Sequence, residues 1–289
     1  MTINQTEINY ILNANEDFLE FEKIRNATNS VHQNNLVHYL STFDNIPIDL
    51  QLRIAIGKWE IPKIALAKNI HTDLTVLVML SKDGPLVMRE IAKNESISED
   101  IQKIILASKD EDAIENLASN ISISDYSQMI IATRGNYREI MNLSGNESIT
   151  EETQFRLALH NRNFDPTYVS IMLTALYKNE KITDKTKNII TEYFENIIQS
   201  ISIQEFEKIM RNNDVEWVLR LADNTRNKKT QIKLFELINV QCDSHMMETL
   251  YSQIIKRLYA NKNLSETAIR LMLESEILKE TLHNSIQNA

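Results

Sequence analysis

The sequence predicts an all-α protein, an α-solenoid in which short helix pairs stack on one another. A Leu-x-x-Asn motif recurs about every 26 residues, and most copies are followed by Ser or Thr with an acid close behind. The chain has only four glycine and four proline residues in 289, whereas the two together make up about 12% of an average protein. Sheet proteins and flexible linkers use these residues at their turns, so both are disfavoured.

The clearest copies of the repeat lie between residues 40 and 170. Their asparagines are separated by steps of 25, 26 and 26 residues, at Asn69, Asn94, Asn120 and Asn146. An earlier unit, 40–65, fits without the asparagine, and later copies end at Asn179, Asn224 and Asn261. The wider spacing of the later copies predicts insertions or longer helices. We therefore expect an N-terminal helical cap at 1–39, repeats at 40–170, and divergent helical repeats with a C-terminal cap at 171–289.

Each unit predicts two helices joined by a short polar turn. The first helix begins at a hydroxyl residue that caps backbone N–H groups, with an acid in the first turn to complement the helix dipole. We expect these caps at Thr72, Ser98, Ser124, Thr150, Thr183 and Ser265. The apolar run that follows predicts a helix buried between neighbouring repeats. An isoleucine fills the corner before the cap, and the second helix turns one apolar residue inward. No unit buries both helices alone, so stacking must create the core.

The recurring asparagine has a structural interpretation. Asparagine tolerates the left-handed αL conformation at a helix C-terminus and can hydrogen-bond the backbone of the turn in which it lies. We expect these side chains to form a ladder that fixes the geometry of the repeats.

The motifs resemble one repeat family in particular. The order Leu-Ala-x-Asn, Thr/Ser-x-Glu/Asp, an apolar helix, Ser-Lys-Asp and Val-Met-Arg-Glu-Ile-Ala-x-Asn is similar to the leucine-rich repeat variant family. The resemblance implies a HEAT-like solenoid of alternating α and 3₁₀ helices in a right-handed superhelix. The family's proline after the asparagine is absent, with Ile70, Glu95, Ile121 and Glu147 in its place. Some bacterial members carry an iron–sulfur module in a Cys-rich segment, but this chain has one cysteine, so we expect no cofactor.

The turns between the two helices supply the candidate binding residues. A basic residue recurs within one position of the same register, at Lys58, Lys82, Lys109, Arg134 and Arg162. Stacking would line these residues up, and together with Trp59 they predict an edge that contacts an acidic partner. Two alternatives stay open. The turns could simply favour solvated lysine, whose field is diluted by Asp83, Asp110, Glu111 and Asp112, and Trp59 could cover the end of the first repeats.

Catalytic and nucleic-acid-binding classes are disfavoured. None of the six histidines lies in a metal-binding motif, and phosphate-binding glycine loops and nucleophile signatures are absent. The 31 basic and 40 acidic residues give a net charge of −9, whereas nucleic-acid binders usually carry a basic excess. We therefore expect no metal, no enzyme activity and no nucleic-acid partner.

The sequence thus favours a non-catalytic scaffold that binds a protein partner. The alternatives are an inhibitor, immunity or anti-defence protein, including one that mimics nucleic acid by its acidity, and a HEAT-like DNA glycosylase. No run of 18 apolar residues predicts a membrane span. The N-terminus is not that of a secretory signal, and the single Cys242 fits a reducing compartment, so we expect the cytoplasm. The Asn-, Ile- and Lys-rich composition suggests a bacterial or phage genome.

Overall fold

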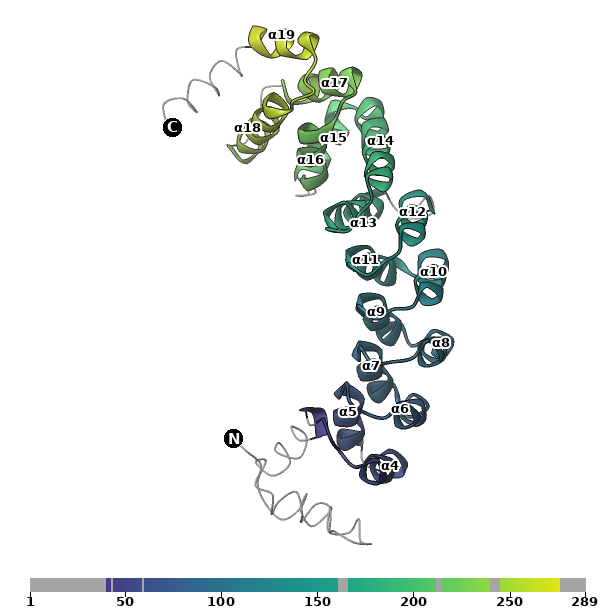
Figure 1. Cartoon of the computed structure of the whole chain (residues 1–289). Helices are drawn as coiled ribbons and strands as arrows, with labels where there is room; N and C mark the ends of the chain where they lie inside the picture. Colours follow the sequence, from purple (N-terminus) through teal and green to yellow (C-terminus); the bar gives the residue numbers. More distant parts are fainter. Residues whose placement is uncertain are drawn as a thin grey trace. The chain divides into compact units, whose positions relative to one another are not determined.

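A computed structural model of the chain describes residues 40–42, 44–58, 60–160, 166–211, 215–239 and 245–275. All regular elements among these residues are helices, labelled α4 to α19 in Figure 1. The all-α prediction is therefore confirmed, and the arrangement is compatible with an α-solenoid. The predicted cap at 1–39 lies outside the described residues. None of the described helices combines the length and apolarity that a membrane span requires.

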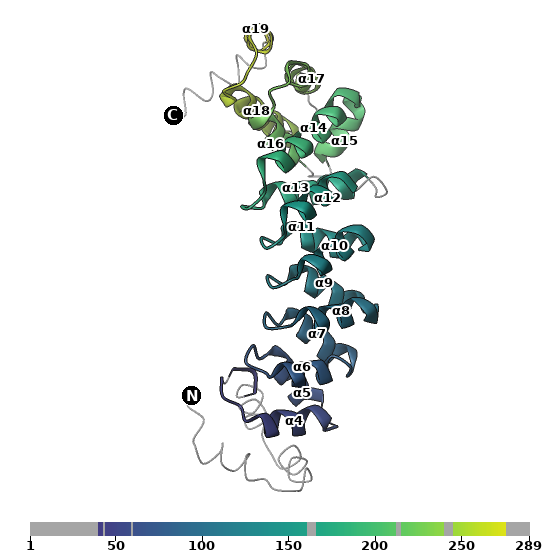
Figure 2. The same cartoon turned by 45° about the vertical axis from the view of Figure 1, so that its right-hand side comes forward.

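The chain divides into two compact units, Met1–Thr150 and Glu151–Ala289. In the first unit, one row holds the first helix of each pair: α4 (Ile48–Ile56), α6 (Leu74–Leu80), α8 (Glu99–Ser108) and α10 (Asp125–Arg134). A second row holds their partners: α5 (Glu60–Lys68), α7 (Pro85–Lys93), α9 (Glu111–Ser119) and α11 (Tyr137–Gly145). Figures 1 and 2 show the pairs following one another in chain order. In the second row, α7 packs between α5 and α9, and α9 packs between α7 and α11.

The core of the first unit lies between the two rows. The leucine or isoleucine of each second helix is fully buried, as at Leu66, Ile91, Leu117 and Leu143. The predicted corner isoleucines are buried as well, at Ile97, Ile123 and Ile149. The prediction that the apolar runs of the first helices are buried between repeats is correct for one face only: Val76, Leu77 and Leu80 of α6 are fully buried, but Met79 is 36% exposed. Each first helix turns one face to the core and leaves the other in solvent.

The N-caps of the first helices lie four residues after each asparagine. Ser98 and Ser124 accept hydrogen bonds from the N–H groups of Ile101 and Ser127, as predicted. The prediction for Thr72 is wrong, because Asp73 caps α6 by accepting the N–H of Thr75 at 2.8 Å. Thr72 instead takes the place of the corner isoleucine, where its buried hydroxyl donates to the carbonyl of Leu66.

The asparagine ladder is present. The side-chain amide of Asn94 donates to the carbonyls of Ala67 and Asn69, at 2.8 and 2.9 Å. Asn120 and Asn146 make the same contacts one and two repeats later. The expected αL conformation is wrong: Asn94 has φ −74° and ψ 123°, which is extended. The N–H of Asn94 donates to the carbonyl of Ile91 at the end of α7, and the chain leaves in an extended direction. The side-chain amide of Asn94 caps the C-terminus of α5, one repeat earlier.

A second ladder, of buried glutamines, was not predicted. Gln102 donates to the carbonyl of Ser122 at 2.9 Å and accepts the N–H of Ser124 at 2.8 Å. Gln51 and Gln128 likewise accept an N–H from the cap of the next first helix. These glutamines lie four residues after each cap, so they tie consecutive first helices together. In α6, Leu77 occupies this position and is fully buried.

The second unit has the same two rows with longer and additional helices. Its first helices are α12 (Glu151–His160), α14 (Asp184–Ser200), α17 (Lys228–Ile238) and α19 (Glu266–Glu274). Its second helices are α13 (Pro166–Lys178), α16 (Glu216–Asn224) and α18 (His245–Ala260). The extra helix α15 (Ile203–Arg211) lies between α14 and α16 in the chain and packs against α18. Longer helices and one inserted helix therefore explain the wider spacing, as predicted.

The ladder position in α16 differs from the prediction by one residue. Asn224 is exposed and belongs to the helix, which ends at Thr225 with an N–H bond to the carbonyl of Leu221. Asn261, which follows the next second helix α18, donates to the carbonyls of Ala222 and Thr225, at 3.0 and 2.9 Å. The prediction for Asn224 is wrong because α16 continues one residue further than the second helices of the first unit.

Candidate functional site

Four of the predicted binding residues lie at matching places in the first unit. Lys58 and Lys82 follow the ends of α4 and α6, Lys109 caps α8, and Arg134 is the last residue of α10. All four are exposed, and within the described part of the chain none of them makes an ion pair. We call these four residues the turn edge. Trp59 and Arg162 lie outside the described residues.

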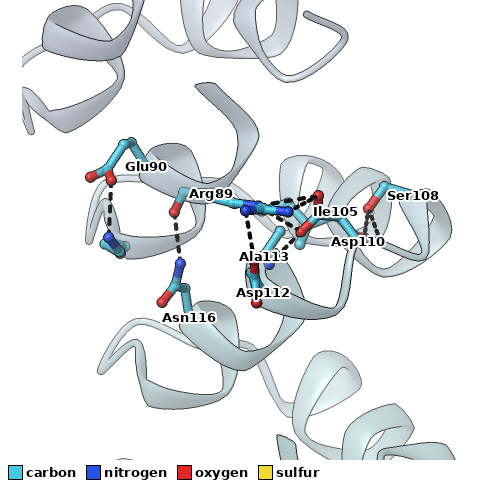
Figure 3. Close-up of polar contacts among 9 residues, drawn as sticks. Arg89, Glu90, Ile105, Ser108, Asp110, Asp112, Ala113 and Asn116 are labelled. Atoms are coloured by element: carbon cyan, nitrogen blue, oxygen red, sulfur yellow. Dashed lines mark hydrogen bonds and ion pairs between the residues drawn. The ribbon is translucent and has the colours of Figure 1, made fainter. Parts of the chain in front are cut away.

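The acidic residues beside the turn edge are held by the preceding repeat. Asp83 pairs with Lys63 of α5 at 2.5 Å. Asp110 receives three hydrogen bonds from Arg89 of α7, from Nε to Oδ1 at 3.1 Å and to Oδ2 at 3.3 Å, and from Nη2 to Oδ2 at 3.2 Å (Figure 3). The charge of Asp83 is therefore balanced by Lys63, whereas the single charge of Arg89 is shared by Asp110 and Asp112, so the acids near Lys109 still reduce its field.

The electrostatics of Asp110 reflect this pairing. Burial acts to raise its pKa, but the hydrogen bonds from Arg89 and from the N–H of Ala113 outweigh burial and hold the pKa below its ordinary value. The carboxylate is thus ionised at neutral pH, and it caps α9 by accepting the N–H of Ala113 at 2.9 Å. One side chain fixes both the turn and the contact between repeats.

The backbone at Lys109 is unusual. Its φ of 61° and ψ of 18° are left-handed, and it is the only residue with a positive φ among those described. Glycine is the usual residue at such a helix end, because a Cβ atom raises the energy of this conformation by about 1–2 kcal/mol. Backbone geometry therefore does not explain why a lysine stands here.

A separate feature lies on the exposed side of the second helices. An open groove of about 360 Å³ runs over α5, α7 and α9, and it is lined by Ile64, Leu86, Arg89, Glu90, Lys93, Asp112, Glu115 and Asn116. Ile64 and Leu86 form its apolar wall, and Leu86 is 49% exposed. Asp112 and Glu115 line its α9 side, and the cations Arg89 and Lys93 lie beside them in the lining.

Polar contacts hold the floor of the groove in place. Arg89 bridges to Asp112 at 2.6 Å as well as to Asp110, and its carbonyl accepts the amide of Asn116 at 3.2 Å (Figure 3). Lys93 bonds to Glu90 at 2.9 Å on the same helix. One repeat later, Asn142 makes the equivalent contact to the carbonyl of Glu115.

Sequence reasoning missed this groove, although a signal was present. Glu90, Asn116 and Asn142 are 26 residues apart, so a polar column runs along the second helices as well as along the turns. The acidic residues of α9 also act on the buried Glu139 of α11. Burial raises the pKa of Glu139, and the charges of Glu111 and Glu115 raise it further, although a backbone hydrogen bond from Asn136 opposes them.

Among the residues that the structure describes, no group of three or more His, Cys, Asp or Glu side chains is arranged to hold a metal ion. Comparison with models of protein families, with curated proteins and with solved structures finds no match to the chain.

Proposed function

We propose that the chain is a non-catalytic scaffold of the α-solenoid type that binds a protein partner. Support for the solenoid comes from the 26-residue period, from the packing of each second helix on the next, and from the asparagine ladder. The resemblance to the leucine-rich repeat variant family adds the expectation of a right-handed superhelix. Stacked repeats offer long, regular surfaces that suit binding more than catalysis.

We further propose that the turn edge is the surface that contacts the partner. The observation that carries this proposal is the pairing of the neighbouring acids. Lys63 balances Asp83, and Arg89 pairs with Asp110 and Asp112, while Lys82 and Lys109 keep unpaired, exposed charges. A regular row of exposed cations favours an acidic partner and faster association with it.

The test is a triple charge reversal. In the variant Lys82→Glu, Lys109→Glu, Arg134→Glu, partner association should slow and become less dependent on salt, while the thermal melt stays unchanged. A matched control reverses three exposed lysines of the second unit, Lys208, Lys256 and Lys262. Both variants have the same net charge, so only the position of the charge differs.

The readout is quantitative affinity capture from cell extract, compared between the wild type and the two variants. Proteins that are lost in the turn-edge variant but kept by the control are its partners. Equal capture by all three proteins would refute the turn edge as the contact surface. A parallel titration with a DNA duplex separates the alternatives, since tight, salt-dependent DNA binding would replace the protein-scaffold proposal with a nucleic-acid function.

A further inference from the structure

We propose that a basic patch in the second unit binds an acidic segment of a partner protein. The patch consists of four cations at the turns that lead into α17 and α19, namely Arg226, Lys228, Lys229 and Lys262. The turn edge belongs to the first unit, so this proposal does not depend on the surface proposed above. It follows from cations that the fold brings together and leaves without partners.

Hydrogen bonds of the two ladders hold the two turns beside each other. Arg226 directly follows Thr225, and Lys262 directly follows Asn261. The side-chain amide of Asn261 donates to the carbonyl of Thr225 at 2.9 Å. Gln231 of α17 donates to a backbone carbonyl of the turn before α19, also at 2.9 Å. The two cations therefore occupy equivalent positions in adjacent repeats.

The cations of the basic patch are exposed and unpaired. All four are exposed, and none of them makes an ion pair within the described part of the chain. The nearby Asp223 bridges to Arg257. Glu195 of α14 accepts hydrogen bonds from the side chains of Thr225 and Asn227, at 2.6 and 3.2 Å. Glu195 thus offsets one of the three cations in residues 226–229, and the turn keeps a positive excess.

The fold does not explain the two lysines at the start of α17. The first helices α8, α10, α14 and α19 each carry an acid in the first turn, where it complements the positive end of the helix dipole. The first turn of α17 has no acid, and Lys228 and Lys229 occupy its first two positions. Cations at this end of a helix lower its stability.

The backbone at the start of α17 is not itself the binding group. Asn227 accepts the N–H groups of Lys229 and Thr230 with its side-chain oxygen, so these donors are already used. The side-chain charges of the basic patch are therefore the groups that attract a ligand, and their spread over two turns suits several negative charges better than one small anion.

The extent of the basic patch selects the kind of polyanion. Exposed acids lie on the same two helices, at Glu236 of α17 and Glu266 of α19, and the whole chain carries a net charge of −9. A DNA duplex carries one charge about every 1.7 Å of its length, so it would extend beyond the patch and meet these acids. A short run of Asp and Glu in a protein would not, and the patch therefore fits an acidic protein segment.

The experiment measures the affinity of the intact chain for a fluorescent octaglutamate peptide, by anisotropy at low and at physiological salt. Binding should weaken at least tenfold in Lys228→Glu with Lys229→Glu. The same variant should melt at a higher temperature than the wild type, because acids suit the positive end of the helix. The control Lys181→Glu with Lys208→Glu makes the same charge change at exposed positions of the second unit and should bind within about twofold of the wild type.

Two further arms separate the alternatives. The triple charge reversal of the turn edge should retain peptide binding; loss of binding there, with full binding by the Lys228/Lys229 variant, would assign acidic segments to the turn edge and overturn the basic patch. A fluorescent DNA duplex should bind more weakly than the peptide, and tighter binding of the duplex would overturn the choice of a protein segment. Absence of peptide binding at low salt, an equal loss in the control, or a lower melting temperature of the Lys228/Lys229 variant would each refute the proposal.

Discussion

Removal of one rung of the asparagine ladder should destabilise the first unit strongly. In Asn120→Ala the side-chain amide no longer donates to the carbonyls of Ala92 and Asn94, both at 2.9 Å. Its oxygen no longer accepts the N–H of Ser122 at 2.8 Å. Asn120 is only 5% exposed, so water replaces these bonds poorly. At about 1–1.5 kcal/mol for each of three bonds, the expected loss is about 3–4.5 kcal/mol.

The assay is urea unfolding followed by circular dichroism, with the free energy obtained by linear extrapolation. Two other asparagines give the scale. Asn116→Ala removes one partly buried bond, to the carbonyl of Arg89 at 3.2 Å, and should cost about 0.5–1.5 kcal/mol. Asn224→Ala changes an exposed residue and should cost less than about 0.5 kcal/mol. If Asn120→Ala cost no more than Asn224→Ala, the ladder would not be a source of stability.

Three further predictions concern packing, backbone and pH. Ile105→Ala, at a fully buried site, should cost about 2–5 kcal/mol and Ser124→Ala about 1 kcal/mol; the reverse order in urea melts would contradict the assignment of core and cap. Lys109→Gly should raise stability by about 0.5–1 kcal/mol, while Lys109→Ala keeps the strain and should show no gain in the same melts. Because burial raises the folded-state pKa of Glu139 above 4.5, its protonated form stabilises the fold. The wild type should therefore lose stability relative to Glu139→Gln as the pH rises from 4.5 to 7, and a constant difference would contradict this.

The period of the repeat was enough to predict the helices and the ladder. Asn94 and Asn120 recur at one register, and a residue that recurs at one register of stacked units must occupy the same environment in each. The prediction at Thr72 was wrong because residue type was given more weight than register. Counting four residues from Asn69 leads to Asp73, which is the true cap, and leaves Thr72 at the corner position.

The glutamine ladder and the groove also have a periodic signal, since Gln102 and Gln128, like Asn116 and Asn142, are 26 residues apart, but the period alone does not say which partners these side chains meet. A glutamine inside an apolar helix, such as Gln102, is indistinguishable by composition from a solvated side chain, and only its partners in the next unit explain its burial. The groove depends on which faces of α5, α7 and α9 remain uncovered. The uncovered faces depend on three-dimensional packing, and the positions of Leu86, Arg89 and Glu115 in the sequence do not reveal them.

Leu77, which interrupts the glutamine ladder, weakens the connection between α6 and α8 in the first unit. The side chain of Leu77 can neither donate nor accept a hydrogen bond, so α6 has no side-chain tether at this position to the cap of α8. The same two helices also pack less extensively than α4 with α6 or α8 with α10. On the opposite side α7 and α9 remain firmly packed. The row of first helices is therefore least tightly connected between α6 and α8, and bending there would change the angle between α7 and α9 and with it the width of the groove.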